Sequence, residues 1–127
     1  MTHNQLSEAI IGVAISIHRH LGPGLLENVY KKILAYELRK RGHQVEEEVP
    51  IPVVWDGQLM DVGFRADLIV DGLVVVELKS IDAIATVHKK ILLTYLRLSD
   101  KRLGLILNFG AEVLRDGISR TVNGLIE

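Results

Sequence analysis

The sequence predicts a mixed α/β fold, in which helices flank a sheet that contains an antiparallel meander. Three patterns lead to this prediction: helical periodicity up to residue 41, alternating strand-like segments with turn dipeptides from 43 to 79, and a further helical segment before an apolar strand. The length of 127 residues suits a single domain, 1–127, with its own hydrophobic core.

Two helices are expected at the start of the chain. From Leu6 to Leu21, apolar residues recur at spacings of three and four, which places them on one helical face. Gly22-Pro23-Gly24 ends this helix, because proline cannot continue the hydrogen-bond ladder. A second helix is predicted from about Leu25 to Arg41, with Gly42 as its left-handed stop. Its predicted core-facing residues are Leu26, Val29, Ile33 and Leu38.

Strands are expected between the second and third helices. His43 to Trp55 contains β-branched residues together with Pro50 and Pro52, which predicts an edge strand or a bulged one. Asp56-Gly57 and Asp71-Gly72 are hairpin signals. The predicted antiparallel strands are 43–55, 58–64, 65–70 and 73–79.

A third helix and a last strand complete the predicted fold. Helical periodicity returns from Asp82 to Leu98, and Ser80 or Asp82 is the expected N-cap. The expected core stripe of this helix is Ile84, Val87, Ile91, Tyr95 and Leu98. Leu103 to Phe109 is almost entirely apolar, which predicts an interior strand, and the tail after Gly110 is a weaker strand or loop.

Composition limits the classes of function. The net charge of −1 gives no general attraction to nucleic acid, so any such binding needs local patches, and 5% aromatic residues argue against a base-stacking surface. The absence of cysteine excludes disulfides and zinc–thiolate sites. The chain has no apolar run long enough to cross a bilayer and no leader-like start, so we expect a cytoplasmic protein without membrane contact. A mean hydropathy of +0.24 hints at apolar surface buried in a homodimer.

The candidate chemistry lies in the strands at 65–70 and 73–79, which carry Asp67, Glu77 and Lys79 among apolar residues. Glu77 and Lys79 share one face of their strand, because side chains alternate. Charged residues are rarely buried unless they are paired or bind a metal.

The pairing register decides whether Asp67 joins them. A two-residue loop at Asp71-Gly72 would pair Asp67 with Val76 and place Asp67 and Glu77 on opposite faces. A three-residue loop or a one-residue bulge would set Asp67 across from Glu77. We predict this second register, since two adjacent carboxylates suit a hard divalent cation such as Mg²⁺. Lys79 would then orient a water molecule or neutralise charge on a phosphate.

Two motifs carry a resemblance to a known family. Asp67 followed by Glu77-Leu78-Lys79 resembles the split Asp…Glu-x-Lys signature of the PD-(D/E)XK nuclease superfamily, with Ala66 where a proline often lies. Gly24-Leu25-Leu26-Glu27-Asn28-Val29-Tyr30 is similar to the motif of the bacterial GxxExxY proteins. His18 to Gly24 and Leu107 to Gly110 also resemble that family, so the resemblance covers nearly the whole chain.

The resemblance implies a restriction-endonuclease-like core and metal-dependent hydrolysis of DNA or RNA. It implies Mg²⁺ or Mn²⁺ held by Asp67, Glu77, Glu27 and the backbone carbonyl of Leu78, with Lys79 assisting catalysis. Family members often carry a glutamine where this chain has Ile91, four residues before Tyr95. The alternatives are therefore a weak or inactive nuclease-fold module that binds nucleic acid or protein, and a hydrolase of small phosphate esters.

Several candidate residues also have a plainer interpretation. Glu27 lies four residues before Lys31, a spacing typical of an exposed helical ion pair. Glu77 and Lys79 would also suit a solvated strand end. His88 is either a phosphate ligand or a half-buried structural histidine.

The charged clusters are equally open to two interpretations. The run Glu46-Glu47-Glu48 is typical of a solvated strand at the edge of a sheet. Two basic clusters are either phosphate contacts or solvated helix faces, and the sequence favours neither. They are Arg39, Lys40 and Arg41, and Lys89, Lys90, Arg97, Lys101 and Arg102.

Overall fold

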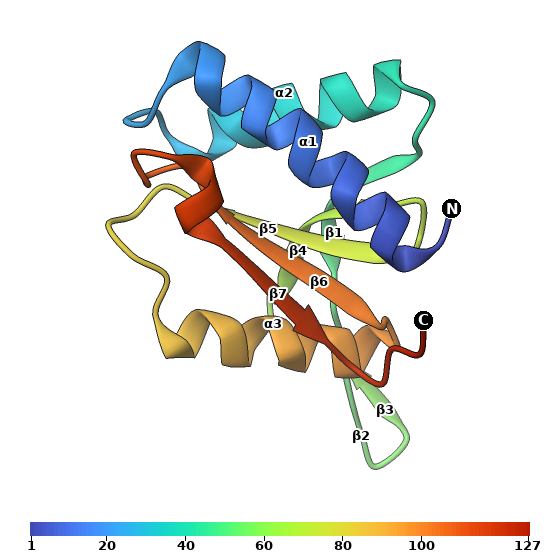
Figure 1. Cartoon of the computed structure of the whole chain (residues 1–127). Helices are drawn as coiled ribbons and strands as arrows, with labels where there is room; N and C mark the ends of the chain where they lie inside the picture. Colours follow the sequence, from blue (N-terminus) through green and yellow to red (C-terminus); the bar gives the residue numbers. More distant parts are fainter.

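A computed structural model describes residues 1–127 as a sheet covered by helices on both faces (Figure 1). Helices α1 and α2 lie on one face of the sheet, and α3 lies on the other. The helices are α1 (His3–Leu21), α2 (Glu27–Lys40) and α3 (Thr86–Ser99). The strands are β1 (Val45–Pro50), β2 (Val53–Trp55), β3 (Gln58–Met60), β4 (Arg65–Val70), β5 (Val74–Lys79), β6 (Leu103–Asn108) and β7 (Ile118–Val122), with a short 3-10 turn at Leu114–Gly117.

The main sheet has five strands in the order β1-β4-β5-β6-β7. Its β1-β4-β5 part is antiparallel, β5 and β6 are parallel and joined through α3, and β7 is antiparallel to β6. The predicted α/β class and mixed sheet with an antiparallel meander are therefore confirmed. Strand β1, which ends at Pro50, lies at the edge of the sheet as expected.

Strands β2 and β3 form a separate hairpin that extends past α3 (Figure 1). Trp55 pairs with Gln58 across the Asp56-Gly57 turn, in which both residues have positive φ, at 52° and 71°. This is the geometry that the dipeptide predicts for a two-residue hairpin loop.

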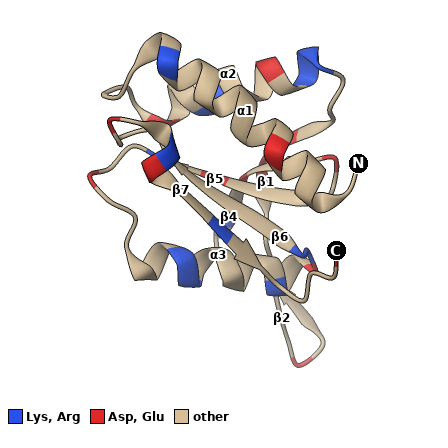
Figure 2. Ribbon diagram, viewed as in Figure 1, with Lys and Arg blue, Asp and Glu red and all other residues tan.

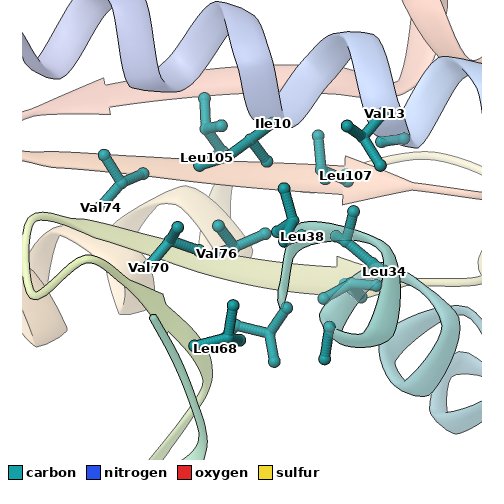
Figure 3. Close-up of a cluster of buried hydrophobic side chains, with 14 of the residues drawn as sticks. Ile10, Val13, Leu34, Leu38, Leu68, Val70, Val74, Val76, Leu105 and Leu107 are labelled. Carbon is teal, nitrogen blue, oxygen red and sulfur yellow. The ribbon is translucent and has the colours of Figure 1, made fainter. Parts of the chain in front are cut away.

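The two faces of the sheet bury separate apolar clusters. The larger one joins α1 and α2 to the sheet, with Ile10, Val13, Leu34 and Leu38 packed against strand residues that include Val76 (Figure 3). The smaller one joins α3 to the other face through Leu92, Tyr95 and Leu96. No helix combines the length and hydropathy that a bilayer span requires.

The first two helices begin and end close to the predicted residues. Thr2 caps α1 through a reciprocal pair of hydrogen bonds with Gln5, and Gly22 and Gly42 have positive φ beyond the two helix ends. The predicted core face of α2 is wrong in part, since Leu26 is 78% exposed and precedes the helix. The buried residues of α2 are Tyr30, Lys31, Leu34, Ala35 and Leu38.

The predicted face of α3 is also wrong in part. Val87, Ile91 and Leu98 are exposed, whereas Leu92, Tyr95 and Leu96 are buried against the sheet. Both sets recur at helical spacing, so periodicity alone could not choose between them. The helix starts at Thr86, and His88 rather than Ser80 or Asp82 bonds to its first turn.

Candidate functional site

The loop between β4 and β5 sets the register of the candidate site. Asp71 and Gly72 have positive φ, at 52° and 65°, and Leu73 N donates to Val70 O at 2.9 Å, which closes a tight turn. Leu73 is then one extra residue, because Val70 pairs with Val74 rather than with Leu73. Continued along both strands, this register sets Asp67 opposite Glu77, so the predicted register is confirmed.

Side chains replace the backbone ladder where Asp67 and Glu77 meet. The amide of Asp67 donates to Glu77 Oε2 at 3.1 Å, and the amide of Leu78 donates to Asp67 Oδ2 at 2.8 Å. On the other side of β4, the β1 ladder is interrupted opposite Asp67, where Glu48 has a φ of 50°. The backbone ladders are therefore interrupted on both sides of Asp67, whose side chain is half-buried.

Glu77 is a buried carboxyl group, only 8% exposed. Burial first, and then the adjacent Asp67 carboxyl group, raise its pKa to about 9, against the opposing effects of the Asp67 amide and the Lys79 ammonium. Two such oxygen donors, one of them costly to ionise alone, suit a hard divalent cation, because the cation converts their repulsion into coordination.

A hollow of about 180 Å³ opens beside these residues on the α3 face. Its polar lining comes from the strands and from α3, and Ile91 lies among the apolar lining residues. Burial first, and then the proximity of the Glu77 carboxyl group, raise the pKa of the Tyr95 phenol above its usual value. The ionisable residues that line this hollow are Arg65, Asp67, Glu77, Lys79, His88 and Tyr95.

Glu27 lies in a second hollow, of about 240 Å³, on the α2 side of Asp67. Asp67 lines both hollows, whereas Glu77 lines only the one beside α3. Lys31 is buried in the second hollow and forms an ion pair with Glu48, so the plainer interpretation of Glu27 and Lys31 as an exposed ion pair is wrong. The structure thus brings Asp67 together with Glu77 and, separately, with Glu27, and no three acidic or histidine side chains form one metal-binding group.

A sequence model of the PD-(D/E)XK nuclease superfamily matches residues 4–121. The chain belongs to the PD-(D/E)XK nuclease superfamily. Members of this superfamily are nucleases that generally depend on divalent metal ions. No curated protein and no solved structure gives a significant match to the chain.

In this PD-(D/E)XK chain, Tyr30 holds the loop that leads into α2. Its hydroxyl donates to Gly22 O at 2.6 Å and accepts from Leu25 N at 3.1 Å, and its ring stacks on Phe109 with centroids 4.3 Å apart. Ser80 Oγ donates to Leu25 O at 2.7 Å, which ties the end of β5 to the same loop. Glu27, the first residue of α2, is placed by these contacts.

Two residues that the sequence did not assign to the candidate site lie beside it. Lys31 and Glu48 line the hollow that holds Glu27. The four-residue spacing of Glu27 and Lys31 signals a shared helical face, but the strained φ of Glu48 leaves no sequence signal. His18, in the first segment that resembles the family, lines neither hollow, and its Nε2 bonds to Ala111 O at 2.8 Å.

Figure 2 shows Lys and Arg segments on α2 and on α3 of this PD-(D/E)XK chain, and the two basic clusters differ in their ion-pair partners. Arg39 on α2 and Arg41 just beyond it form ion pairs with Glu47 and Glu37, at 2.9 and 2.5 Å. The acidic run is therefore held in part by α2, and Lys32 also pairs with Glu47. On the α3 side of the sheet, four cations take part in no such ion pair: Lys89, Lys90, Arg97 and Lys101.

Proposed function

We propose that this chain is a metal-dependent phosphodiesterase that cleaves DNA or RNA. The observation that carries the proposal is that Asp67 and Glu77 meet across neighbouring strands, where the Asp67 amide donates to Glu77 Oε2 at 3.1 Å. Lys79 lines the same hollow as these two carboxyl groups. Membership of a nuclease superfamily supports the same chemistry.

Each residue has a proposed task. Asp67, Glu77 and the carbonyl of Leu78 hold Mg²⁺ or Mn²⁺, and Glu27 approaches Asp67 from the α2 side. The bound ion supplies Lewis-acid charge at the scissile phosphate. Lys79 orients the attacking water and offsets the negative charge that grows on the phosphate.

The unpaired cations of α3 support a polyanionic substrate. Lys89 and Lys90 are exposed and lie in the helix that borders the Glu77 hollow. A nucleic-acid backbone that passes along α3 would meet these side chains on its way to the hollow. The weak whole-protein charge is no obstacle, because the attraction is local.

A second candidate function is a nuclease-fold module that binds without turnover. Ile91 favours it, since an aliphatic side chain lines the hollow where a polar group would assist a phosphate.

At a finer level, we propose that the chain is one domain and a GxxExxY protein. We also propose a homodimer, for which the exposed side chains of Trp55 and Leu59 offer apolar surface.

A cleavage assay separates the two functions. Labelled single- and double-stranded DNA and RNA, with a small phosphate ester for comparison, are incubated with Mg²⁺, Mn²⁺ or EDTA. We expect metal-dependent cleavage by the wild type, and at least a hundredfold loss with Lys79→Ala, because electrostatic groups at the reacting phosphate typically contribute that much. Lys40→Ala is the matched control, since Lys40 is exposed on α2 and distant from both hollows.

The outcomes are distinct. Equal cleavage by wild type and Lys79→Ala would point to a contaminating nuclease. No cleavage by either, with intact oligonucleotide binding, would favour the binding module. Cleavage of the small ester alone would indicate that the substrate is a small phosphate ester and not nucleic acid.

A further inference from the structure

His88 has one ring nitrogen committed to the protein backbone. Ala85 N, just before α3, donates to His88 Nδ1 at 2.9 Å. An imidazole nitrogen that accepts a hydrogen bond carries no proton, so the neutral ring has its proton on Nε2. The fold therefore selects one tautomer and leaves an N–H donor at the far side of the ring.

This donor has no protein partner and lies at the candidate site. His88 is half-buried and lines the hollow of about 180 Å³ that also holds Asp67, Glu77 and Lys79. Residues 88 and 92 are one helical turn apart, and Leu92 is fully buried against the sheet, so α3 holds the ring beside the strands.

His88 shares the hollow with three other donors, which are Arg65, Lys79 and the Tyr95 hydroxyl. Arg65 bonds to Asp61 at 3.1 Å, and Lys79 lies on the strand face beside Glu77. A phosphate that enters has two non-bridging oxygens to satisfy beside two carboxylates that repel it. A neutral N–H donor at the α3 side meets this requirement.

We propose that His88 contacts the substrate, and that its Nε2–H donates to a non-bridging phosphoryl oxygen of the nucleic-acid backbone. The inference rests on the proposed phosphodiesterase function and adds to it a residue that orients the phosphate from the helix side. His88 thus has two tasks, one for each ring nitrogen: Nδ1 fixes the start of α3, and Nε2 receives the substrate.

The start of α1 provides the means of separating these tasks. There Gln5 occupies the same third helical position, and its Oε1 accepts from Thr2 N at 2.9 Å, as His88 Nδ1 accepts from Ala85 N. Glutamine and glutamate both make this backbone contact at a helix start. His88→Gln therefore keeps the contact and offers an amide N–H, His88→Glu keeps the contact without a donor, and His88→Ala removes both.

The experiment compares these three variants by thermal unfolding, by oligonucleotide affinity in Ca²⁺ and in EDTA, and by kcat and KM in Mg²⁺. We expect His88→Gln to bind within a fewfold of the wild type. His88→Ala should bind about tenfold to a hundredfold more weakly, since it loses a hydrogen bond to a charged group, and His88→Glu should bind at least as weakly, because its carboxylate also repels the phosphate. Only His88→Ala should lower the melting temperature. The ¹⁵N NMR spectrum of the wild-type ring should show a protonated Nε2 and an unprotonated Nδ1.

Each opposing result has a definite meaning. If His88→Ala binds and cleaves like the wild type, or His88→Gln binds as weakly as His88→Ala, His88 has only the structural task and the inference is wrong. A proton on Nδ1 in the NMR spectrum would also overturn it. A wild type that neither binds nor cleaves nucleic acid would overturn the proposed function itself, and this inference with it.

Discussion

Glu77 is a buried acidic side chain with another carboxylate as its neighbour. An ionised carboxylate in such a place costs folding free energy unless a cation or donors offset it. The single amide donor from Asp67 offsets only part of this cost, which is why the pKa of Glu77 lies so far above its usual value of 4.5. The side chain is thus better suited to cation binding than to stabilising the metal-free protein.

We therefore expect the stability of the metal-free protein to fall as the pH rises. A carboxyl group with a raised pKa binds its proton more tightly in the folded state, so its contribution is complete below pH 4.5 and is lost as the pH rises toward about 9. The slope is at most about 1.4 kcal/mol per pH unit. Glu77→Gln should flatten this dependence and stabilise the protein at pH 8.

Urea unfolding in EDTA at pH 5, 6.5 and 8 measures the effect. Glu8→Gln is the matched control, because Glu8 is exposed on α1. Addition of Mg²⁺ at pH 8 should stabilise the wild type more than Glu77→Gln. Parallel pH profiles for the wild type and Glu77→Gln would show that Glu77 ionises without cost.

At the scale of single elements, turns were easier to predict than helix faces. The Asp-Gly dipeptides at 56–57 and 71–72 specify the hairpins, since few other residues adopt their positive φ. Which face of a helix is buried depends on more than the spacing of its apolar residues. In α3, Ile91 and Leu92 differ by one step of rotation, and only the contacts of Leu92 with the sheet decide which of them is buried.

The segment after β5 depends on a close backbone approach. Asn108 Oδ1 accepts from Ile81 N at 3.1 Å and from Gly110 N at 3.0 Å, which holds Ile81 against Gly110. A Cβ atom on Gly110 would lie 2.2 Å from Ile81 O. Only glycine fits at position 110, beside Ile81, which lies two residues beyond the candidate Lys79.

We expect Gly110→Ala to destabilise the protein by about 1–3 kcal/mol, because the backbone must move to admit the methyl group. Gly12→Ala is the matched control: it lies inside α1 with no atom within 4 Å of the added Cβ, and should stabilise by about 0.5–1 kcal/mol. Denaturant unfolding of both variants tests this. Equal stability of Gly110→Ala and wild type would mean that the backbone after β5 can move to admit the methyl group at no cost in folding free energy.

At the scale of the whole molecule, the order of elements and the sheet were predictable, but the meeting of distant residues was not. Local periodicity and turn chemistry act within about ten residues and predicted the two strands, whereas the register that pairs Asp67 with Glu77 was chosen because two carboxylates suit a divalent cation. The contact of Lys31 with Glu48 joins a helix to an edge strand through a backbone distortion. The position of Asp67 between two hollows likewise depends on three strands at once.

The β2–β3 hairpin should be the least protected part of the fold. It pairs with no other strand, and Val54, Trp55 and Leu59 are 61%, 71% and 72% exposed. We expect its amides to exchange with deuterium much faster than those of β5 and β6, because a lone two-stranded hairpin is marginally stable in water. Mass spectrometry at several protein concentrations tests this, and protection that grows with concentration would instead indicate burial in a dimer.

The last residue, Glu127, accepts hydrogen bonds from the amides of His3 and Asn4 at 2.8 and 3.0 Å, so the two ends of the described chain lie together. Joining them through a short glycine linker and reopening the chain between Asp56 and Gly57 would give a circular permutant in which every strand keeps its neighbours in the main sheet. Because the new ends fall in an exposed turn, the permuted protein should fold and retain whatever activity the native order has.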